Sequence, residues 1–372
     1  MRKAAVESLE IKEISIEGYE KVVVITDEQV GLKAIIAIHN TTLGPALGGT
    51  RIYPYPTFEA ALTDAKRLAK GMTYKSALAE AGLGGGKSVI ICHPKHKNKE
   101  MLTSFAEAVH RLEGLYTCAE DSGCSLQDVT TIGHHTPYVV GIAHEKSSGN
   151  PAPFTAWGTF RGIQATLQML DGSTSLEGKV VAIQGLGSVG MPLAELLFWQ
   201  GAKLIVSDID WEKTQTIAKK YHATACPAED ILGETCDILA PCAMGGIINP
   251  QTIANLRCRG IAGCANNQLL SDQDADELKK LGILYAPDFV INSGGLINVS
   301  LEIEEEGYNP ITARKKTDQI YDHLIRLFGI SEQNNCSTHH AALSLADYRI
   351  KYGVGQRRTP PRYHHFEAFR RG

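Results

Sequence analysis

The stretch that decides the fold of this chain is VVAIQGLGSVG, residues 180–190, in which a run of strand-forming residues leads into three glycines spaced G-x-G-x-x-G. The apolar segment 193–197 follows and predicts a helix. In a strand–turn–helix unit of this kind, Gly185 permits the tight turn and Gly187 lets a phosphate approach the backbone. Gly190 lets the helix pack closely on the strand. The stretch therefore predicts a dinucleotide-binding turn at a helix N-terminus.

An acidic residue in the expected place extends this interpretation. The next predicted strand, KLIVSD, ends in Asp208, 18 residues after Gly190. A carboxylate there bonds the ribose hydroxyls and repels a 2′-phosphate, so the sequence predicts NAD rather than NADP. The alternative is a glycine-rich surface turn and an unrelated aspartate. The predicted cofactor-binding residues of this segment are Gly185, Leu186, Gly187, Ser188, Val189, Gly190 and Asp208. Pro192 is expected to remove a helical hydrogen bond.

Strands and helices alternate around this unit and predict an α/β fold with two domains separated by a cleft. Residues 151–330 are expected to form a Rossmann-type, doubly wound parallel sheet that binds NAD. Residues 1–150 are expected to form a mixed domain that binds substrate and carries catalysis, rejoined by residues 331–372. Its predicted elements are a hairpin of Val22–Thr26 and Leu32–Ile38, a helix over Thr57–Met72 with Thr57 as N-cap, and a strand over Ser88–Cys92. In the second domain, Val290–Ile291 is expected to be a strand and Ile311–Phe328 one helix.

Composition excludes several classes of protein. The chain has 372 residues, of which 43% are hydrophobic and 21% charged, as in a globular protein of two or three domains. Its net charge of −4 argues against binding to nucleic acid or to an anionic membrane. We find neither an apolar run near the roughly 20 residues of a spanning helix nor a signal-peptide core. Nine cysteines without a Cys-x-x-Cys pair favour reduced thiols, and hence the cytoplasm.

Two lysines and an aspartate are candidates for chemistry. Lys75 comes just past the first predicted helix, and Lys87 ends the run GLGGGK, where glycine allows close approach of a ligand. Two ammonium groups brought together lower each other's pKa, so one could bind a carboxylate while the other acts as a base. Asp121, in AEDSG, could move protons beside them. Spacing alone leaves the alternative of two solvated lysines and an ordinary acidic loop.

Together these segments resemble the glutamate/leucine/phenylalanine/valine group of amino-acid dehydrogenases, most nearly its leucine-specific members, from about residue 20 to about residue 330. The blocks that carry the resemblance are residues 31–39, 41–51, 71–75, 83–87, 119–121, 148–151, 176–179, 240–243, 245–249 and 294–298. The resemblance implies a reversible oxidative deamination of an L-amino acid by NAD to the 2-oxo acid, ammonia and NADH. It assigns the substrate carboxylate to Lys75 and catalysis to Lys87 and Asp121.

The resemblance also implies the remaining site residues. Gly48 and Gly49 lie beneath the substrate, and the side-chain pocket is lined by Leu47, Ala119, Leu296 and Val299. These four side chains are apolar, which disfavours glutamate, since its γ-carboxylate would be buried unpaired. A branched-chain substrate (leucine, also valine or isoleucine) fits best, and one methylene decides among them. Thr155, Ala243 and Asn267 are further cofactor-binding residues by resemblance, and a homo-oligomer is expected.

Alternatives and departures remain at this stage. The chain could be a valine or phenylalanine dehydrogenase of the same group, or a catalytically silent NAD-binding homologue. Asn266 and the segment after residue 331 depart from the family pattern. The set Cys118, Cys124, His134 and His135 fits no zinc spacing, so no metal is expected. The pairs His339-His340 and His364-His365 and the acidic run Glu302–Glu306 are expected on the surface.

Overall fold

The computed structural model describes residues 8–366 and divides the chain into two compact units. The first comprises residues up to 150, 299–310 and those from 348 onward; the second comprises 151–298 and 311–347. The expected domain blocks were 151–330 and 331–372. In the structure residues 299–310 already belong to the first unit, and the final return to that unit comes at residue 348 rather than 331. The chain returns early because Glu302, in the short insert 299–310, is buried against backbone of residues 141 and 148 in the first unit.

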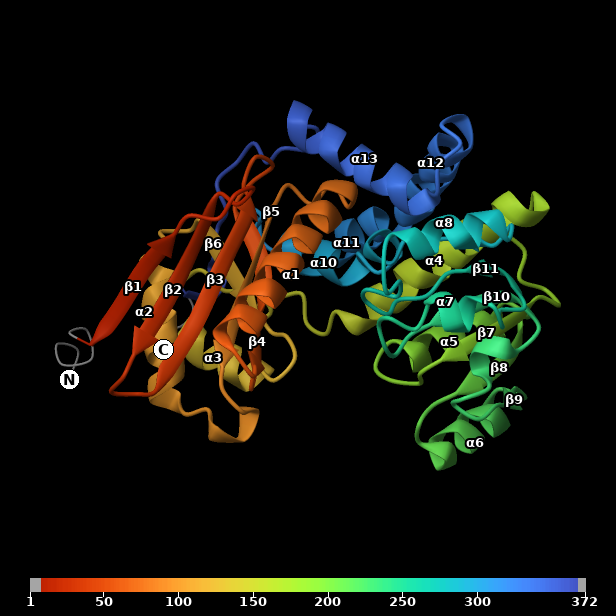
Figure 1. Cartoon of the computed structure of the whole chain (residues 1–372), viewed down its shortest axis with the longest axis horizontal. Helices are drawn as coiled ribbons and strands as arrows, with labels where there is room; N and C mark the ends of the chain where they lie inside the picture. Colours follow the sequence, from red (N-terminus) through yellow and green to blue (C-terminus); the bar gives the residue numbers. More distant parts are fainter. Residues whose placement is uncertain (1–7, 367–372) are drawn as a thin grey trace. The chain divides into compact units, whose positions relative to one another are not determined.

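Among the described residues, the first unit contains a six-stranded sheet of order β1-β2-β3-β5-β4-β6 (Figure 1). Its strands are β1 (Leu9–Ile14), β2 (Lys21–Asp27), β3 (Leu32–Asn40), β4 (Ala46–Tyr53), β5 (Gly84–Ile91) and β6 (Tyr116–Ala119). Antiparallel pairing joins β1 to β2, β2 to β3 and β3 to β5, whereas β4 pairs parallel with both β5 and β6. The predicted hairpin of β2 and β3 is confirmed. The last three strands bring distant parts of the chain side by side.

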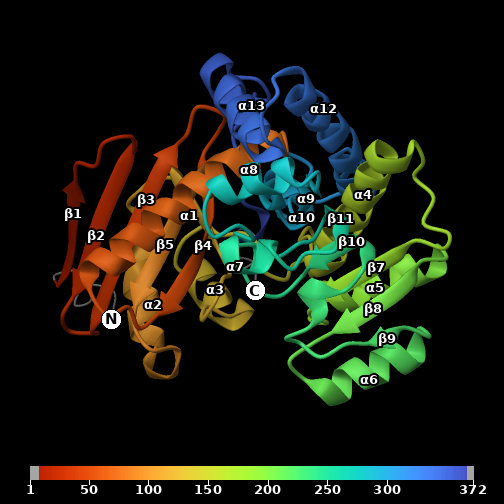
Figure 2. The same cartoon turned by 45° about the vertical axis from the view of Figure 1, so that its right-hand side comes forward.

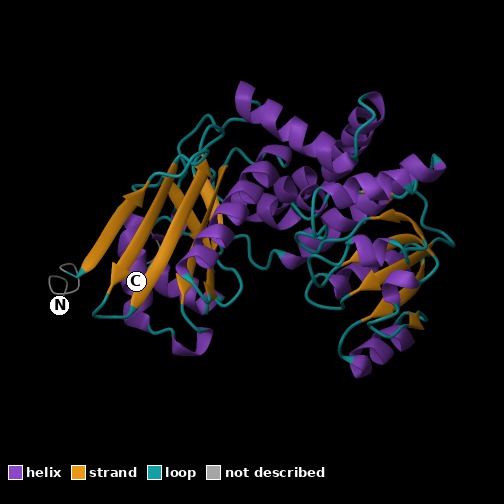
Figure 3. Ribbon diagram, viewed as in Figure 1, coloured by secondary structure: helices purple, strands orange, loops and turns teal. Residues whose placement is uncertain are grey.

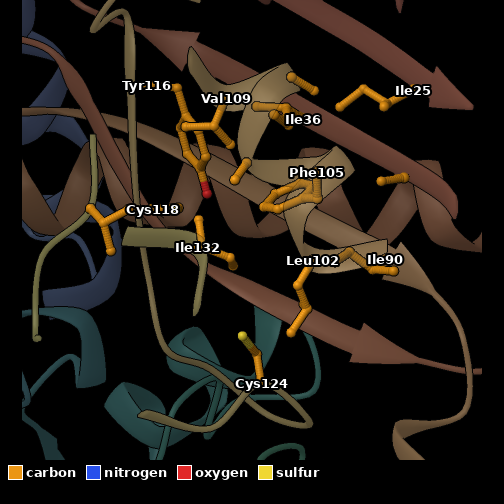
Figure 4. Close-up of a cluster of buried hydrophobic side chains, with 14 of the residues drawn as sticks. Ile25, Ile36, Ile90, Leu102, Phe105, Val109, Tyr116, Cys118, Cys124 and Ile132 are labelled. Carbon is orange, nitrogen blue, oxygen red and sulfur yellow. The ribbon is translucent and has the colours of Figure 1, made fainter. Parts of the chain in front are cut away.

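Helices cover both faces of this sheet (Figure 2). They are α1 (Phe58–Leu78), α2 (Lys99–His110) and α3 (Leu126–Gly133), with a 3₁₀ turn at Pro94–His96. On one face Ile35 and Ala37 pack with the alanines of α1. On the other face Ile36 packs with Phe105 of α2 and Ile132 of α3, as Figure 4 shows. Successive residues of β3 point to opposite faces, so the central residues 34–38, which are covered on both sides, are all apolar.

The glycine run forms the start of β5, which begins at Gly84, four residues before the predicted strand start at Ser88. Helix α1 begins where predicted, with Thr57 capping the amide of Ala60, but it continues six residues beyond Met72. Its final turns pack on β5 so closely that a Cβ on Gly85 would lie 2.0 Å from the Thr73 nitrogen. Glycine is thus required because a helix backbone lies on the strand.

The second unit contains, in the described residues, a parallel sheet of order β12-β11-β10-β7-β8-β9. Figure 3 draws its strands in orange among the purple helices. The strands are β7 (Val180–Gln184), β8 (Lys203–Ser207), β9 (Thr224–Ala225), β10 (Cys236–Pro241), β11 (Cys258–Ile261) and β12 (Leu284–Tyr285). The helices that follow along the chain are α4 (Ala152–Asp171), α5 (Gly190–Trp199), α6 (Trp211–Lys220), α7 (Pro250–Ile253), α8 (Gln273–Lys280), α9 (Asp288–Ile291), α10 (Gly294–Ser300), α11 (Pro310–Asp318), α12 (Ile320–Gln333) and α13 (Thr338–Tyr352), with a 3₁₀ turn at Ile231–Gly233. A further 3₁₀ turn, Leu301–Ile303, belongs to the first unit, in which α10 and α13 also end. The α/β class with a doubly wound parallel second sheet is confirmed.

Two local predictions need revision, and a third agrees with the structure. Val290–Ile291 belongs to helix α9 and not to a strand, because two apolar residues do not distinguish a short strand from a short helix. The predicted helix Ile311–Phe328 is two helices that meet at residue 319. Pro192 is the third residue of α5. The amides before and after it, those of Met191 and Leu193, donate to the Gly187 and Val189 carbonyls, so the proline removes one hydrogen bond from this first turn, as expected. No helix in residues 8–366 is long and apolar enough to span a bilayer.

Candidate active site and dinucleotide-binding turn

Lys87 and Asp121 form a buried ion pair at the centre of the first unit. Lys87 lies in β5 and Asp121 lies two residues beyond β6, on either side of β4. The Lys87 Nζ pairs with Asp121 Oδ2, and Lys87 is only 6% exposed. Gly49 of β4 lies between them: a Cβ there would be 2.8 Å from the Asp121 Cβ and 3.3 Å from the Lys87 Nζ. The sheet order thus brings these three predicted residues together.

The turn that carries Asp121 is docked on β4. The amide of Ile52 donates to the Ser122 carbonyl at 2.9 Å, and the Cys124 amide donates to the Asp121 carbonyl at 2.9 Å. Gly123 has φ +78°, and a Cβ there would lie 2.1 Å from the Ile52 oxygen, so only glycine lets the turn approach the strand. The carboxylate is therefore held on a short, well-bonded turn.

Burial and charge shift both titrations. Burial lowers the pKa of Lys87 below its ordinary value, although the Asp121 carboxylate acts in the opposite direction. Burial raises the pKa of Asp121, but the charges of Lys87 and Arg51 outweigh it and hold that pKa below its ordinary value. The pair therefore combines an ionised carboxylate with an amine that loses its proton more readily than a solvated lysine.

Sequence reasoning missed three residues beside this pair. Arg51 Nε lies 3.4 Å from Asp121 Oδ2, and Arg51 also pairs with Asp64 of α1 at 2.9 Å. The Tyr55 hydroxyl donates to Asp64 at 2.6 Å. Arg51 is the last residue of the block 41–51, which carries part of the family resemblance, so the sequence could have pointed to it. Asp64 belongs to no such block and lies among ordinary residues of a helix surface, so no sequence signal marked it.

The glycine pair of β4 is explained by crowding. A Cβ on Gly48 would lie 1.8 Å from the Gly86 oxygen of β5. The buried hydroxyl of Tyr116 donates to the Gly48 carbonyl at 2.7 Å. Leu47 precedes the pair and is buried, and Ala119 is partly buried at the end of β6.

The remaining predicted substrate residues are placed as follows. Lys75 is half-buried in the last turn of α1, inside the helix and not past it. It lies two residues beyond Thr73, which contacts Gly85 of β5. Leu296 and Val299 lie on α10, Leu296 in the second unit and Val299 in the first. Their roles towards a substrate stay predictions.

The glycine-rich turn of the second unit has the geometry that its sequence suggests. Gly185 has φ +94°, and a Cβ on Gly190 would lie 1.9 Å from the Gly185 oxygen, so helix α5 packs directly on the turn. A Cβ on Gly187 would meet nothing within 4 Å, which leaves the backbone open on that side. Ala243 contacts the turn, since a Cβ on Gly185 would be 2.6 Å from its methyl carbon.

Asp208 ties the end of β8 to this turn. Its Oδ2 accepts from the Leu186 amide at 2.7 Å, and its Oδ1 accepts from the Asp210 amide at 3.0 Å. Burial raises the pKa of Asp208, but these amides and Lys213 hold it below its ordinary value, so the carboxylate is ionised at neutral pH. A dinucleotide thus fits the residues present: an open glycine backbone, a helix N-terminus and a fixed acid.

Two further predicted cofactor residues lie on firmly held backbone. Thr155, in α4, donates its hydroxyl to the Pro151 carbonyl at 3.3 Å. Asn267 has φ +52°, and its amide donates to Asp288 Oδ2. The departure at Asn266 has a local explanation, because its Oδ1 accepts from the Asn292 side chain at 2.8 Å.

Several residues expected on the surface are buried. Glu302 is 3% exposed and accepts from the amides of Gly141 and Ser148 at 2.8 and 2.7 Å, so it closes a loop and is not part of a solvated face. His339, His364 and His365 are also buried. Residues 8–366 contain no cluster of His, Cys, Asp and Glu that could hold a metal.

A parallel sheet with a dinucleotide turn, joined in one chain to a unit with a buried Lys–Asp pair, defines a nicotinamide-dependent dehydrogenase. Residues 19–139 match the family model of the Glu/Leu/Phe/Val dehydrogenase dimerisation domain, and residues 208–342 match that of glutamate/leucine/phenylalanine/valine dehydrogenase. The chain belongs to this family of NAD(P)-dependent oxidoreductases and is an amino-acid dehydrogenase.

Individual relatives agree with this assignment. The chain is 50% identical over 335 residues to leucine dehydrogenase of Geobacillus stearothermophilus, which covers 90% of this chain and 91% of that protein. It is 44% identical to phenylalanine dehydrogenase of Caldalkalibacillus thermarum, with 90% and 92% covered. The crystal structure of L-tryptophan dehydrogenase from Nostoc punctiforme matches with a TM-score of 0.81 at 43% identity, covering 90% of this chain and 97% of that one.

Proposed function

We propose that this chain catalyses the NAD-dependent, reversible oxidative deamination of a branched-chain L-amino acid, with leucine preferred and valine and isoleucine also accepted. The observation that carries the proposal is the buried Lys87–Asp121 pair with Gly49 beneath it. A base of lowered pKa beside an ionised carboxylate is what the attack of water on an imine requires near neutral pH.

NAD is proposed over NADP because of Asp208. Its ionised carboxylate stands at the end of β8, beside the glycine turn. There it would bond ribose hydroxyls and oppose a 2′-phosphate. Gly185 to Gly190, with Thr155, Ala243 and Asn267, would hold the cofactor. When bound, NAD supplies the hydride acceptor for the overall conversion of L-amino acid, water and NAD into 2-oxo acid, ammonium, NADH and a proton.

The chain's own residues would divide the remaining work. Lys75 would hold the substrate carboxylate through its charge. Lys87 would take a proton from the water that attacks the imine carbon, and the ionised Asp121 would accept a proton and pass it to the departing amine. Gly49 has no side chain, so the substrate could approach both groups closely. Burial of the pair strengthens each electrostatic interaction within it.

The substrate side chain is the most open part of the proposal. Leu47, Ala119, Leu296 and Val299 are apolar, which favours an aliphatic side chain over the carboxylate of glutamate. The similarity to leucine dehydrogenases supports leucine. The phenylalanine and tryptophan dehydrogenases at 44–45% identity make an aromatic substrate the second candidate.

We also propose a cytoplasmic homo-oligomer. The family model that matches residues 19–139 is described as a dimerisation domain. All nine cysteines are unpaired, in keeping with a reducing compartment.

Initial rates of NADH formation with L-leucine, L-valine, L-isoleucine, L-phenylalanine, L-tryptophan and L-glutamate test the proposal. Leucine should have the highest kcat/KM, and turnover with none of the six would refute it in favour of a silent NAD-binding homologue. Lys87→Ala should lower kcat by roughly 10²–10⁴-fold while NADH binding persists. Lys33→Ala, at an exposed position on the neighbouring strand β3, is the matched control and should turn over normally.

A further inference from the structure

The Lys87–Asp121 pair is half of a longer chain of charges. Arg51, in β4, contacts Asp121 Oδ2 through Nε at 3.4 Å and Asp64 Oδ2 through a terminal nitrogen at 2.9 Å. The charges therefore alternate as Lys87, Asp121, Arg51 and Asp64. Their side chains are between 8% and 25% exposed, so water screens them little.

The far end of this chain is fixed from two sides. The Tyr55 hydroxyl donates to Asp64 Oδ2 at 2.6 Å, and Arg67 donates to Asp64 Oδ1 at 3.2 Å. Asp64 lies on α1, whereas Arg51 and Asp121 lie on or beside the sheet. The guanidinium is therefore anchored to a helix at one end while it faces the Asp121 carboxylate at the other. This arrangement orients Asp121 towards Lys87 by attraction from both flanks.

We propose that Arg51 is a positioning residue that orients the catalytic Asp121, and that Arg51 and Asp64 together set the pH at which Lys87 becomes a base. The inference deepens the proposed function and rests on the role given there to Lys87. It gives a role to the charges of Arg51 and Asp64, which a mechanism that uses Lys87 and Asp121 alone does not explain.

The two outer charges act on Lys87 with opposite sign. The positive Arg51 opposes protonation of Lys87 and lowers its pKa, whereas the negative Asp64 favours protonation and raises that pKa. Arg51 also helps hold the pKa of Asp121 low. Without Arg51, the pKa of Lys87 and of Asp121 should both rise. Without Asp64, the pKa of Lys87 should fall.

Other titratable groups lie on the elements packed around β5. Besides Tyr55 and Arg67, they include Lys33 and His39 on β3, Lys66, Lys70, Tyr74 and Lys75 on α1, Tyr116 and Cys118 on β6, and Glu120 and Cys124 near Asp121. None of them is altered in the variants below, so their contributions stay common to all comparisons.

The test compares Arg51→Gln, Asp64→Asn and the conservative Arg51→Lys in the full chain. The readout is the acid limb of kcat/KM for amino-acid oxidation against pH, which reports the free enzyme's base. Arg51→Gln should move this limb to higher pH and Asp64→Asn to lower pH, each by about 0.5–1 unit, as expected for one charge at the second neighbour in a shielded site. Arg51→Lys retains the positive charge and should leave the limb near its wild-type position.

A second readout needs no turnover. Trace acetylation of Lys87 by acetic anhydride, followed by peptide mass spectrometry across pH, reports the fraction of neutral amine. The same opposite shifts are expected. If they occur in a protein that oxidises none of the amino acids, the proposed function fails and the charge chain stands.

A purely structural role would damage both variants in the same way. The inference would be overturned if the acid limb of kcat/KM moved in the same direction in Arg51→Gln and Asp64→Asn, or if it moved in neither variant. If circular dichroism shows Arg51→Gln to be unfolded, Asp64→Asn and Arg51→Lys decide: a downward shift in the former with a near-normal limb in the latter supports the inference, and any other result refutes it.

Discussion

The substitution Gly49→Ala tests whether the β4 backbone sets the geometry of the Lys87–Asp121 pair. An alanine Cβ would lie 2.6 Å from the Glu120 carbonyl oxygen and 2.8 Å from the Asp121 Cβ. Carbon atoms pack best at about 3.5–4.0 Å, so the Asp121 turn must retreat by roughly 1 Å. Neither neighbour can rotate aside, since one is backbone and the other is bonded directly to it.

The expected consequence is a large loss of rate with a modest loss of stability. A displacement of about 1 Å in a catalytic group can cost on the order of 10²-fold in kcat, equivalent to about 2.7 kcal/mol of activation free energy. Overpacking of this kind typically lowers the free energy of unfolding by about 1–3 kcal/mol. NADH binding, which we place in the second unit, should be unchanged.

The assay is steady-state kcat for leucine oxidation together with urea unfolding and NADH fluorescence titration. Gly71→Ala is the matched control, because a Cβ at this exposed position of α1 meets nothing within 4 Å. It should leave kcat unchanged and raise the free energy of unfolding by about 0.5–1 kcal/mol. Normal kcat in Gly49→Ala would show that the crowding around the pair does not control its chemistry.

Two further predictions concern other parts of the molecule. Asp208→Ala removes the carboxylate beside the glycine turn, so KM for NAD should rise about tenfold and the NAD/NADP preference in kcat/KM should fall; an unaltered preference would contradict its role. Burial, with the charge of His144, lowers the pKa of His365 to about 4, so this side chain is neutral when folded. Its stabilising contribution should be complete above pH 6.5 and lost as pH falls from 6.5 towards 4, amounting to roughly 2 kcal/mol between pH 7.5 and 5. The free energy of unfolding of His365→Gln, measured by urea at both pH values, should therefore vary less with pH than that of the wild type, and equal pH dependence would count against burial of the neutral ring.

Predictions succeeded where the deciding interactions are local. The hairpin of β2 and β3, the Thr57 cap and strand β7 were read from period, cap chemistry and turn residues that lie within a few positions of one another. The short segment at Val290 failed because its few apolar residues suit a strand or a helix equally. Glu302 was placed in solvent because its amide partners lie more than 150 residues away in sequence.

The candidate catalytic residues were named by resemblance, but their arrangement was not foreseen. Arg51 and Asp64 carry no motif that relates one to the other, and only the packing of α1 on the sheet makes them partners. The run GLGGGK was noticed for its glycines, yet its reason is the close approach of Thr73 to Gly85.

By itself, the sequence determined the dinucleotide turn, since the strand, the three glycines, the helix and Asp208 are all contained in 29 successive positions, 180–208. The tertiary structure alone decided that Lys87, Gly49 and Asp121 meet. That meeting depends on β4 lying between β5 and β6. The spacing of residues does not record this order, because α1 separates β4 from β5 along the chain and α2 separates β5 from β6.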